Sequence, residues 1–198
     1  MQVIKPQDLL SIEEYERQRE TFRAKIIELK RRRRIAVGPL ITLVFENRET
    51  LQFQIQEMIR VERIVDLAKV QDELDVYNAL LPTPDELSAT LLIEITDEDM
   101  MKPWLDQFMG LDHGETVAIV AGGERAFGMF ESGHSHETKI SAVHFVRFRP
   151  TAAMKAACAD LRQPVLLTVD HGEYHAQTTV PGSMREEWLS DLNESCEC

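Results

Sequence analysis

The chain has no long hydrophobic run. None of its apolar stretches approaches the ~18 residues that a membrane-spanning helix requires, although 43% of its 198 residues are hydrophobic. The first residues also lack the charged, apolar and small-residue succession of a signal peptide. We therefore exclude an integral membrane protein, expect no membrane partner and expect a cytoplasmic location.

Cysteine is scarce, with only Cys158, Cys196 and Cys198 in the chain. Three such positions do not make a disulfide framework and are typical of a reducing compartment. The Cys196-x-Cys198 spacing could bind a soft metal or exchange disulfides. The carboxylates of Glu194 and Glu197 disfavour thiolates there, and we interpret this end as a frayed tail.

Motifs for phosphate binding and for nucleophilic hydrolysis are absent as well. The sequence contains no G-x-x-x-x-G-K-[ST], no G-x-G-x-x-G and no G-x-S-x-G, which are the glycine-rich loops and the serine elbow of those enzymes. Gly122-Gly123 lies between two β-prone runs and predicts a hairpin turn. The sequence therefore indicates no particular reaction.

Negative charge dominates, but it is unevenly distributed. Residues 1–34 hold ten Lys and Arg against six Asp and Glu, net +4, whereas the remainder holds twelve against twenty-eight, net −16. An acidic body with a basic arm is not typical of a nucleic-acid-binding protein, so nucleic acid is not an expected partner. The arm could pack on the chain's own acidic surface or dock on an acidic partner.

The basic arm is predicted to be a long helix. Ser11 and Glu14 form a capping box, and the helix should end near Arg33, before Gly38-Pro39. The adjacent arginines 31–34 could clamp phosphates or complement the helix C-terminus, but consecutive positions lie 100° apart, so they splay around the axis. A basic stripe within about 60° on the helical wheel is formed by Arg19, Arg23, Lys30 and Arg34.

The remaining pattern predicts an α+β fold. β-prone runs predict strands at 40–45, 51–55, 90–95, 116–121, 126–130, 139–148, 165–170 and 174–180, and the first two should form a hairpin. Helical spacing and caps predict one long or two abutting helices over 56–80, a helical turn at 82–86, and helices over 96–110 (broken at Pro103), 151–162 and 183–192.

Short connections between the later strands imply a mainly antiparallel sheet, open or barrel-like, with flanking helices and the long N-terminal helix. We expect a single domain over 1–198. It would consist of a helical and hairpin half at about 1–110, a β-rich half at about 111–192 and a tail at 193–198.

Polar residues inside apolar patterns give the candidate site. His144 shares one face of its predicted strand with apolar neighbours, so its imidazole should be buried and need hydrogen-bond partners. A backbone-satisfied core histidine is one interpretation, and a catalytic or polar site with Glu57 and Glu94 is the other. Glu57 could equally belong to a solvated helix face.

A metal site is a second hypothesis. His134 and His136 are two apart in a predicted loop, and His144 is one strand away, so the three imidazoles could hold iron, zinc or manganese. Exposed loop histidines without a metal are the alternative. The sequence identifies no other cofactor.

Three stretches carry a family resemblance: residues 45–63, residues 77–94 without 83–85, and residues 139–145. Together they resemble a bacterial family catalogued as domain of unknown function 3501. The family has no established activity, so it transfers no catalytic residue. Its members tend to be encoded beside rubrerythrin-like and cysteine-rich iron–sulfur proteins, which implies such proteins as partners and a role in redox or peroxide-stress metabolism.

Two functions follow as hypotheses. The first is an accessory or binding protein that docks its partners through the basic helix and the acidic body. The alternative is a small metal-dependent enzyme whose site gathers Glu57, Glu94 and His144, or the loop of His134 and His136.

Overall fold

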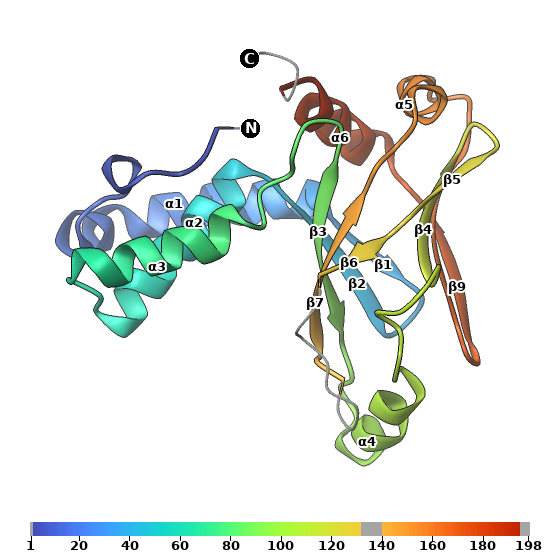
Figure 1. Ribbon diagram of the computed structural model, residues 1–198, viewed down its shortest axis with the longest axis horizontal. Coiled ribbons are helices and arrows are strands. Elements are labelled where there is room, and N and C mark those ends of the chain that lie inside the picture. The colour runs from blue at the N-terminus through green and yellow to red at the C-terminus, as the bar shows by residue number, and fades with distance from the viewer. Residues whose placement is uncertain (1, 132–139, 195–198) are drawn as a thin grey trace.

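A computed structural model describes residues 2–131 and 140–194. Two antiparallel sheets pack face to face, and a lobe of three helices covers the outer face of one of them (Figure 1). Helix α4 lies at one end of the sheets, and α5 and α6 lie at the other (Figure 1). No helix in the described ranges is both long and apolar enough to cross a bilayer.

Both sheets are antiparallel throughout. Sheet A has the order β1-β2-β3-β7-β6, with β1 at Arg34–Val37, β2 at Ile41–Glu46, β3 at Leu87–Ile93, β7 at Val143–Phe148 and β6 at Met129–Phe130. Sheet B has the order β5-β4-β8-β9, with β5 at Glu124–Phe127, β4 at Val117–Ala121, β8 at Val165–His171 and β9 at Tyr174–Thr179. This confirms the α+β class and the mainly antiparallel sheet.

The chain passes from sheet B to sheet A at Gly128, between β5 and β6. At the other side, the Tyr174 hydroxyl donates to the carbonyl of Val37 at 2.5 Å, and Thr178 donates to that of Ala36 at 2.8 Å. These bonds from side chains hold the edges of β9 and β1 together without a strand ladder. The described residues therefore form an open sandwich, and the barrel-like alternative is wrong.

Alternation along the strands builds two cores. Leu43, Leu91 and Phe148 are fully buried between the sheets, as expected for inward-facing positions of period two. Phe145 points to the opposite face of sheet A and packs against the helical core. The helical lobe thus packs on the outer face of sheet A. Polar positions on that face lie near helix α1.

Six α-helices and one 3-10 helix are described. Their bounds are η1 at Pro6–Asp8, α1 at Ile12–Arg33, α2 at Arg48–Glu62, α3 at Leu67–Asn78, α4 at Glu98–Gln107, α5 at Ala152–Ala159 and α6 at Gly182–Glu194. The capping box that starts α1 is confirmed. Ser11 Oγ accepts from the Glu14 amide at 3.3 Å, and the Glu14 carboxylate accepts from the Ser11 amide at 3.2 Å.

The predicted hairpin over 40–55 is wrong in its second half, because 51–55 belongs to helix α2. Asn47 caps that helix: its Oδ1 accepts from the Thr50 amide at 3.0 Å, and Thr50 Oγ1 accepts from the Asn47 amide at 2.9 Å. Leu51 and Ile55, four positions apart, are fully buried on one helical face. The cap and the buried face outweigh the β propensity of the segment.

Smaller differences concern helix boundaries. Of the two alternatives expected for the segment 56–80, the structure shows two helices and not one long helix. They are separated because Arg63 adopts a left-handed conformation with φ 51° after α2. The predicted helical turn at 82–86 is a reverse turn, with Asp85 at φ 65°. Helix α4 continues through Pro103 where a break was predicted, and the predicted strand over 126–130 is divided at Gly128 between the two sheets.

Candidate basic docking site

Helix α1 carries the basic stripe, but neighbouring carboxylates pair two of its four members. Arg19 donates to Glu57 at 2.8 and 2.9 Å, and Arg34 donates to Glu94 at 2.6 Å. Arg23 is exposed and Lys30 half-buried, and within residues 2–131 and 140–194 neither has an ion pair. The free positive charge of the stripe is therefore concentrated at Arg23 and Lys30.

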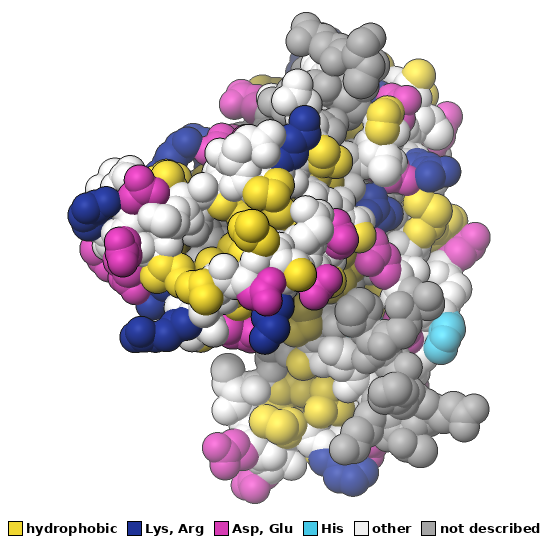
Figure 2. All heavy atoms as spheres, turned by 60° about the vertical axis from the view of Figure 1, so that its left-hand side comes forward, with side chains coloured by type: hydrophobic (Ala, Val, Ile, Leu, Met, Phe, Trp, Pro, Cys, Tyr) yellow, Lys and Arg dark blue, Asp and Glu magenta, His cyan; other side chains and the backbone are white. Residues whose placement is uncertain are grey.

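These two cations lie beside a surface pocket that we call the basic pocket. It is open to solvent, has a volume of about 300 Å³ and is lined by Arg23, Ile26, Ile27, Lys30, Arg31, Arg34 and Phe53. Ile27 is 43% exposed, and other apolar side chains are exposed elsewhere on the helical lobe (Figure 2). No carboxylate is among the described residues of the lining. The pocket thus combines an apolar floor with a cationic rim.

Glu57 takes part in a network of hydrogen bonds and ion pairs between α1 and α2. Besides Arg19, it accepts from the buried Tyr15 hydroxyl at 2.6 Å and from Arg60 at 3.3 Å. The hydrogen bonds from Arg19, helped by those from Tyr15 and Arg60, lower the pKa of Glu57 to about 2. Burial, together with Glu57, raises the pKa of Tyr15. Glu57 is therefore a charged structural anchor that fixes α1 on α2.

Glu94 lies on the outer face of sheet A and pairs with Arg34, which lines the basic pocket. Thr42 donates to one of its oxygens at 2.5 Å and Arg34 to the other at 2.6 Å. The hydrogen bond from Thr42, followed by that from Arg34, lowers the pKa of Glu94. Its side chain remains 41% exposed, so Glu94 is accessible to a bound partner but is anionic and already paired.

His144 occupies a different environment. It is 1% exposed, stands opposite Leu91 in the ladder and meets Phe130 edge-on with ring centroids 5.9 Å apart. Its Nε2 lies 2.8 Å from the carbonyl oxygen of Ser141, so that nitrogen donates to the backbone. The prediction of a buried imidazole is confirmed, and the Ser141 carbonyl takes the place that Glu57 or Glu94 was expected to fill.

The structure does not bring the three candidate residues together. His144 faces the sandwich core, Glu94 lies on the opposite face of sheet A, and Glu57 lies between two helices. The described ranges contain no cluster of three or more His, Cys, Asp or Glu side chains that could hold a metal. His134, His136 and the Cys196-x-Cys198 pair lie outside the described residues, and the metal hypothesis for them stays a prediction.

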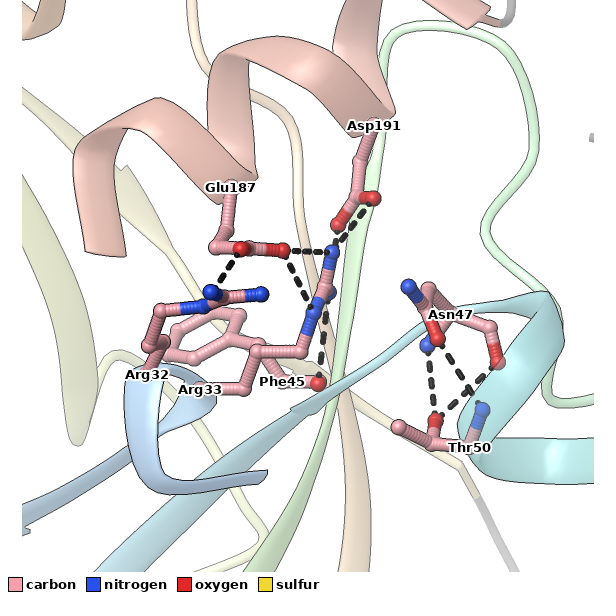
Figure 3. A network of polar contacts seen from close by, with 7 residues as sticks. All are labelled: Arg32, Arg33, Phe45, Asn47, Thr50, Glu187 and Asp191. Atoms are coloured by element: carbon pink, nitrogen blue, oxygen red, sulfur yellow. Dashed lines mark hydrogen bonds and ion pairs between the residues drawn. The ribbon is translucent and has the colours of Figure 1, made fainter. Parts of the chain in front are cut away.

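A buried ionic contact was missed in the sequence analysis. Arg33, 1% exposed, donates to both oxygens of Asp191 at 2.7 and 2.8 Å and also pairs with Glu187, which in turn binds Arg32 (Figure 3). This cluster fastens the end of α1 to α6. Arg32 and Arg33 of the run 31–34 are thus structural, and no local sequence signal identifies partners more than 150 positions away.

Two further buried carboxylates were not predicted. Glu86, 2% exposed, accepts from Arg149 at 2.6 Å and from Arg147 at 3.1 Å. Burial alone would raise the pKa of Glu86, but hydrogen bonds from Thr83 and Arg149 lower it. Glu46, 1% exposed, accepts from the Thr90 hydroxyl at 2.8 Å. Neither residue lines the basic pocket.

Comparison with known proteins places the chain in a family. A family model described as "Protein of unknown function (DUF3501)" matches residues 3–192. The chain belongs to the DUF3501 family. This confirms the resemblance seen in residues 45–63, 77–82, 86–94 and 139–145.

A crystal structure of a protein of unknown function from Burkholderia pseudomallei is similar to this DUF3501 protein along nearly its whole length. The two chains are 30% identical, the TM-score is 0.87, and the match covers 96% of this chain and 100% of the other. No curated protein matches significantly. The relatives therefore support the fold and the family and supply no activity.

Proposed function

We propose that this DUF3501 protein is a cytoplasmic accessory protein that binds an acidic partner protein through the basic pocket. The observation that carries the proposal is the division of the stripe: Glu57 and Glu94 neutralise Arg19 and Arg34, whereas Arg23 and Lys30 have no carboxylate partner in the described ranges. Cations left unpaired beside exposed apolar surface are a feature of docking sites, where they guide an oppositely charged partner into register.

The apolar floor favours a protein over a nucleic acid as the partner. Ile27 and Phe53 offer surface that a side chain can cover, whereas a phosphate backbone would leave it exposed to water. The formal charge of the whole chain is −12, which would repel a long polyanion outside the basic pocket. As partner class we propose rubrerythrin-like or cysteine-rich iron–sulfur proteins, because the family resemblance implies them.

Site-specific photo-crosslinking in the producing bacterium tests this function. The photoreactive residue p-benzoylphenylalanine replaces Ile27 in the basic pocket or, as a matched control, Val61, which is 65% exposed on α2. The proposal expects a rubrerythrin-like or iron–sulfur protein to be crosslinked from position 27 and not from position 61. It also expects the adduct to disappear when Arg23→Glu and Lys30→Glu are added. An adduct that survives both charge reversals contradicts docking at this pocket.

A further inference from the structure

The shape and lining of the basic pocket specify the partner's chemistry beyond its acidity. We infer that the pocket receives one large apolar side chain flanked on both sides by carboxylates, presented by a segment of the partner. This inference rests on the proposed docking function. In addition to the charge attraction that guides the partner, the inference requires that a side chain of the partner fill the pocket.

The volume of the pocket limits what it can take. About 300 Å³ accommodates one large aliphatic or aromatic side chain and is at the lower end of the range for whole small-molecule sites. The apolar part of the lining is Ile26, which is 4% exposed, together with Phe53 and the 43% exposed Ile27. A side chain inserted there would be desolvated at the centre of the contact, where most binding energy in protein interfaces is concentrated.

The cationic rim of the pocket determines which residues of the partner should flank the inserted apolar side chain, which we call the anchor. Arg23 and Lys30 are seven positions apart on α1, or two helical turns, and both line the pocket. Arg31 and Arg34 complete the cationic rim. Their exposed pairs with Glu28 at 3.2 Å and Glu94 at 2.6 Å are of the type that contributes little to stability. Carboxylates before and after the anchor would therefore meet cations on both sides.

A second hollow beside α1 differs from the basic pocket in its charge. On the other end of α1, a pocket lined by Arg17, Arg60 and Arg63 also has apolar walls. However, Glu13 and Glu16 line it as well, and Glu16 pairs with Arg60 at 3.4 Å. Its lining therefore holds three cations against two carboxylates, whereas the lining of the basic pocket holds four cations. The basic pocket has no carboxylate among its described lining residues, so an acidic segment should bind there in preference to the second hollow.

Synthetic peptides test the inference with the full-length protein. The probe is a fluorescein-labelled peptide with one leucine between two glutamate pairs, and its binding is measured by fluorescence anisotropy at low salt. Three comparison probes are the peptide with serine for leucine, the peptide with glutamine for every glutamate, and a labelled single-stranded oligonucleotide. The protein variants are Ile27→Ser and the double variant Arg23→Glu/Lys30→Glu, with Val61→Ser and Arg125→Glu as surface controls elsewhere.

The inference expects binding of the leucine peptide that weakens about tenfold or more, equivalent to 1.4 kcal/mol, when leucine or Ile27 is replaced by serine. The charge reversals and the glutamine peptide should abolish binding, and both controls should leave it unchanged. Equal binding of the leucine and serine peptides with no effect of Ile27→Ser overturns the inference but leaves electrostatic docking intact. No binding of the leucine peptide, or tighter binding of the oligonucleotide, also overturns it. The crosslinking experiment judges the docking function separately.

Discussion

Arg33 and Asp191, 158 positions apart, form a two-pronged ion pair with N–O distances of 2.7 and 2.8 Å at the junction of α1 and α6 (Figure 3). Both side chains are almost completely buried, at 1% and 4% exposure. The pair fixes the C-terminal end of the helix that carries the basic pocket. The position of the pocket relative to sheet A therefore depends on a contact between distant parts of the chain.

Replacing Arg33 by Met should destabilise the protein by about 3–5 kcal/mol, because Asp191 would remain buried without its cation. The double variant Arg33→Met/Asp191→Leu should recover a large part of that loss, since both buried charges are removed and Glu187 keeps its contact with Arg32 at 2.9 Å. Urea unfolding measures these free energies. Arg31→Met, whose side chain is 74% exposed, is the matched control and should cost under about 0.5 kcal/mol. An equal, small loss in all three variants would contradict the structural role of the pair.

Glu57 should make the stability of the helical lobe pH-dependent. Its pKa in the folded state is lowered from 4.5 to about 2, so its contribution is fully present above about pH 5 and is lost as the pH falls toward 2. At pH 7, Glu57→Gln should cost about 1–2 kcal/mol through the weakened bonds to Arg19 and Tyr15. The difference in unfolding free energy between wild type and this variant should shrink between pH 5 and pH 2. Glu62→Gln, exposed at the end of the same helix, should show no such trend.

Gly128 is required where the chain changes sheets. A Cβ atom at this position would lie 2.5 Å from Val146 Cγ2 and 3.2 Å from Phe148 Cε1, in the fully buried sandwich core. Gly128→Ala should therefore destabilise the protein by about 1–3 kcal/mol through overpacking. Val146→Ala removes the nearer atom, so the double variant should lose less stability than the sum of the two single variants. Strict additivity in thermal or urea unfolding would mean that the two positions do not touch.

The metal hypothesis can be tested residue by residue. In protein purified without a histidine tag, His144→Ala should not change the content of iron, zinc or manganese measured by plasma mass spectrometry, because its ring is buried against Phe130 and Ser141. The matched variant is His134→Ala/His136→Ala. A stoichiometric metal that disappears with His144→Ala would favour the metal-enzyme alternative and contradict the assignment of His144 as a core residue.

Local signals in the sequence predict much of the fold. The capping box at Ser11 and the apolar run of 90–95 give helix α1 and strand β3 because a few neighbouring residues determine each of them. Helix α2 was partly mistaken for a strand, although Asn47 and Thr50 carry a cap and Leu51, Ile55 and Ile59 recur every four positions. In that segment the β-prone letters were weighted above the helical spacing.

The candidate site was predictable only in part, because ion pairing is decided by tertiary contacts. A helical wheel places Arg19, Arg23, Lys30 and Arg34 on one stripe. It contains no information that α2 brings Glu57 to Arg19, or that Glu94, directly after β3, lies beside Arg34. Phe53, which forms the floor of the pocket, comes from a segment expected to be a strand. The apolar half of the site therefore became visible only in the structure.

The most direct measurement is the dissociation constant of a purified rubrerythrin-like or iron–sulfur partner for wild type and for Arg23→Glu/Lys30→Glu, determined at low and at physiological salt. Docking through the basic pocket predicts that the double reversal weakens binding at least about tenfold at low salt. It also predicts that salt weakens the wild-type complex far more than the variant complex. Equal dissociation constants for the two proteins at both salt concentrations would contradict docking at the basic pocket.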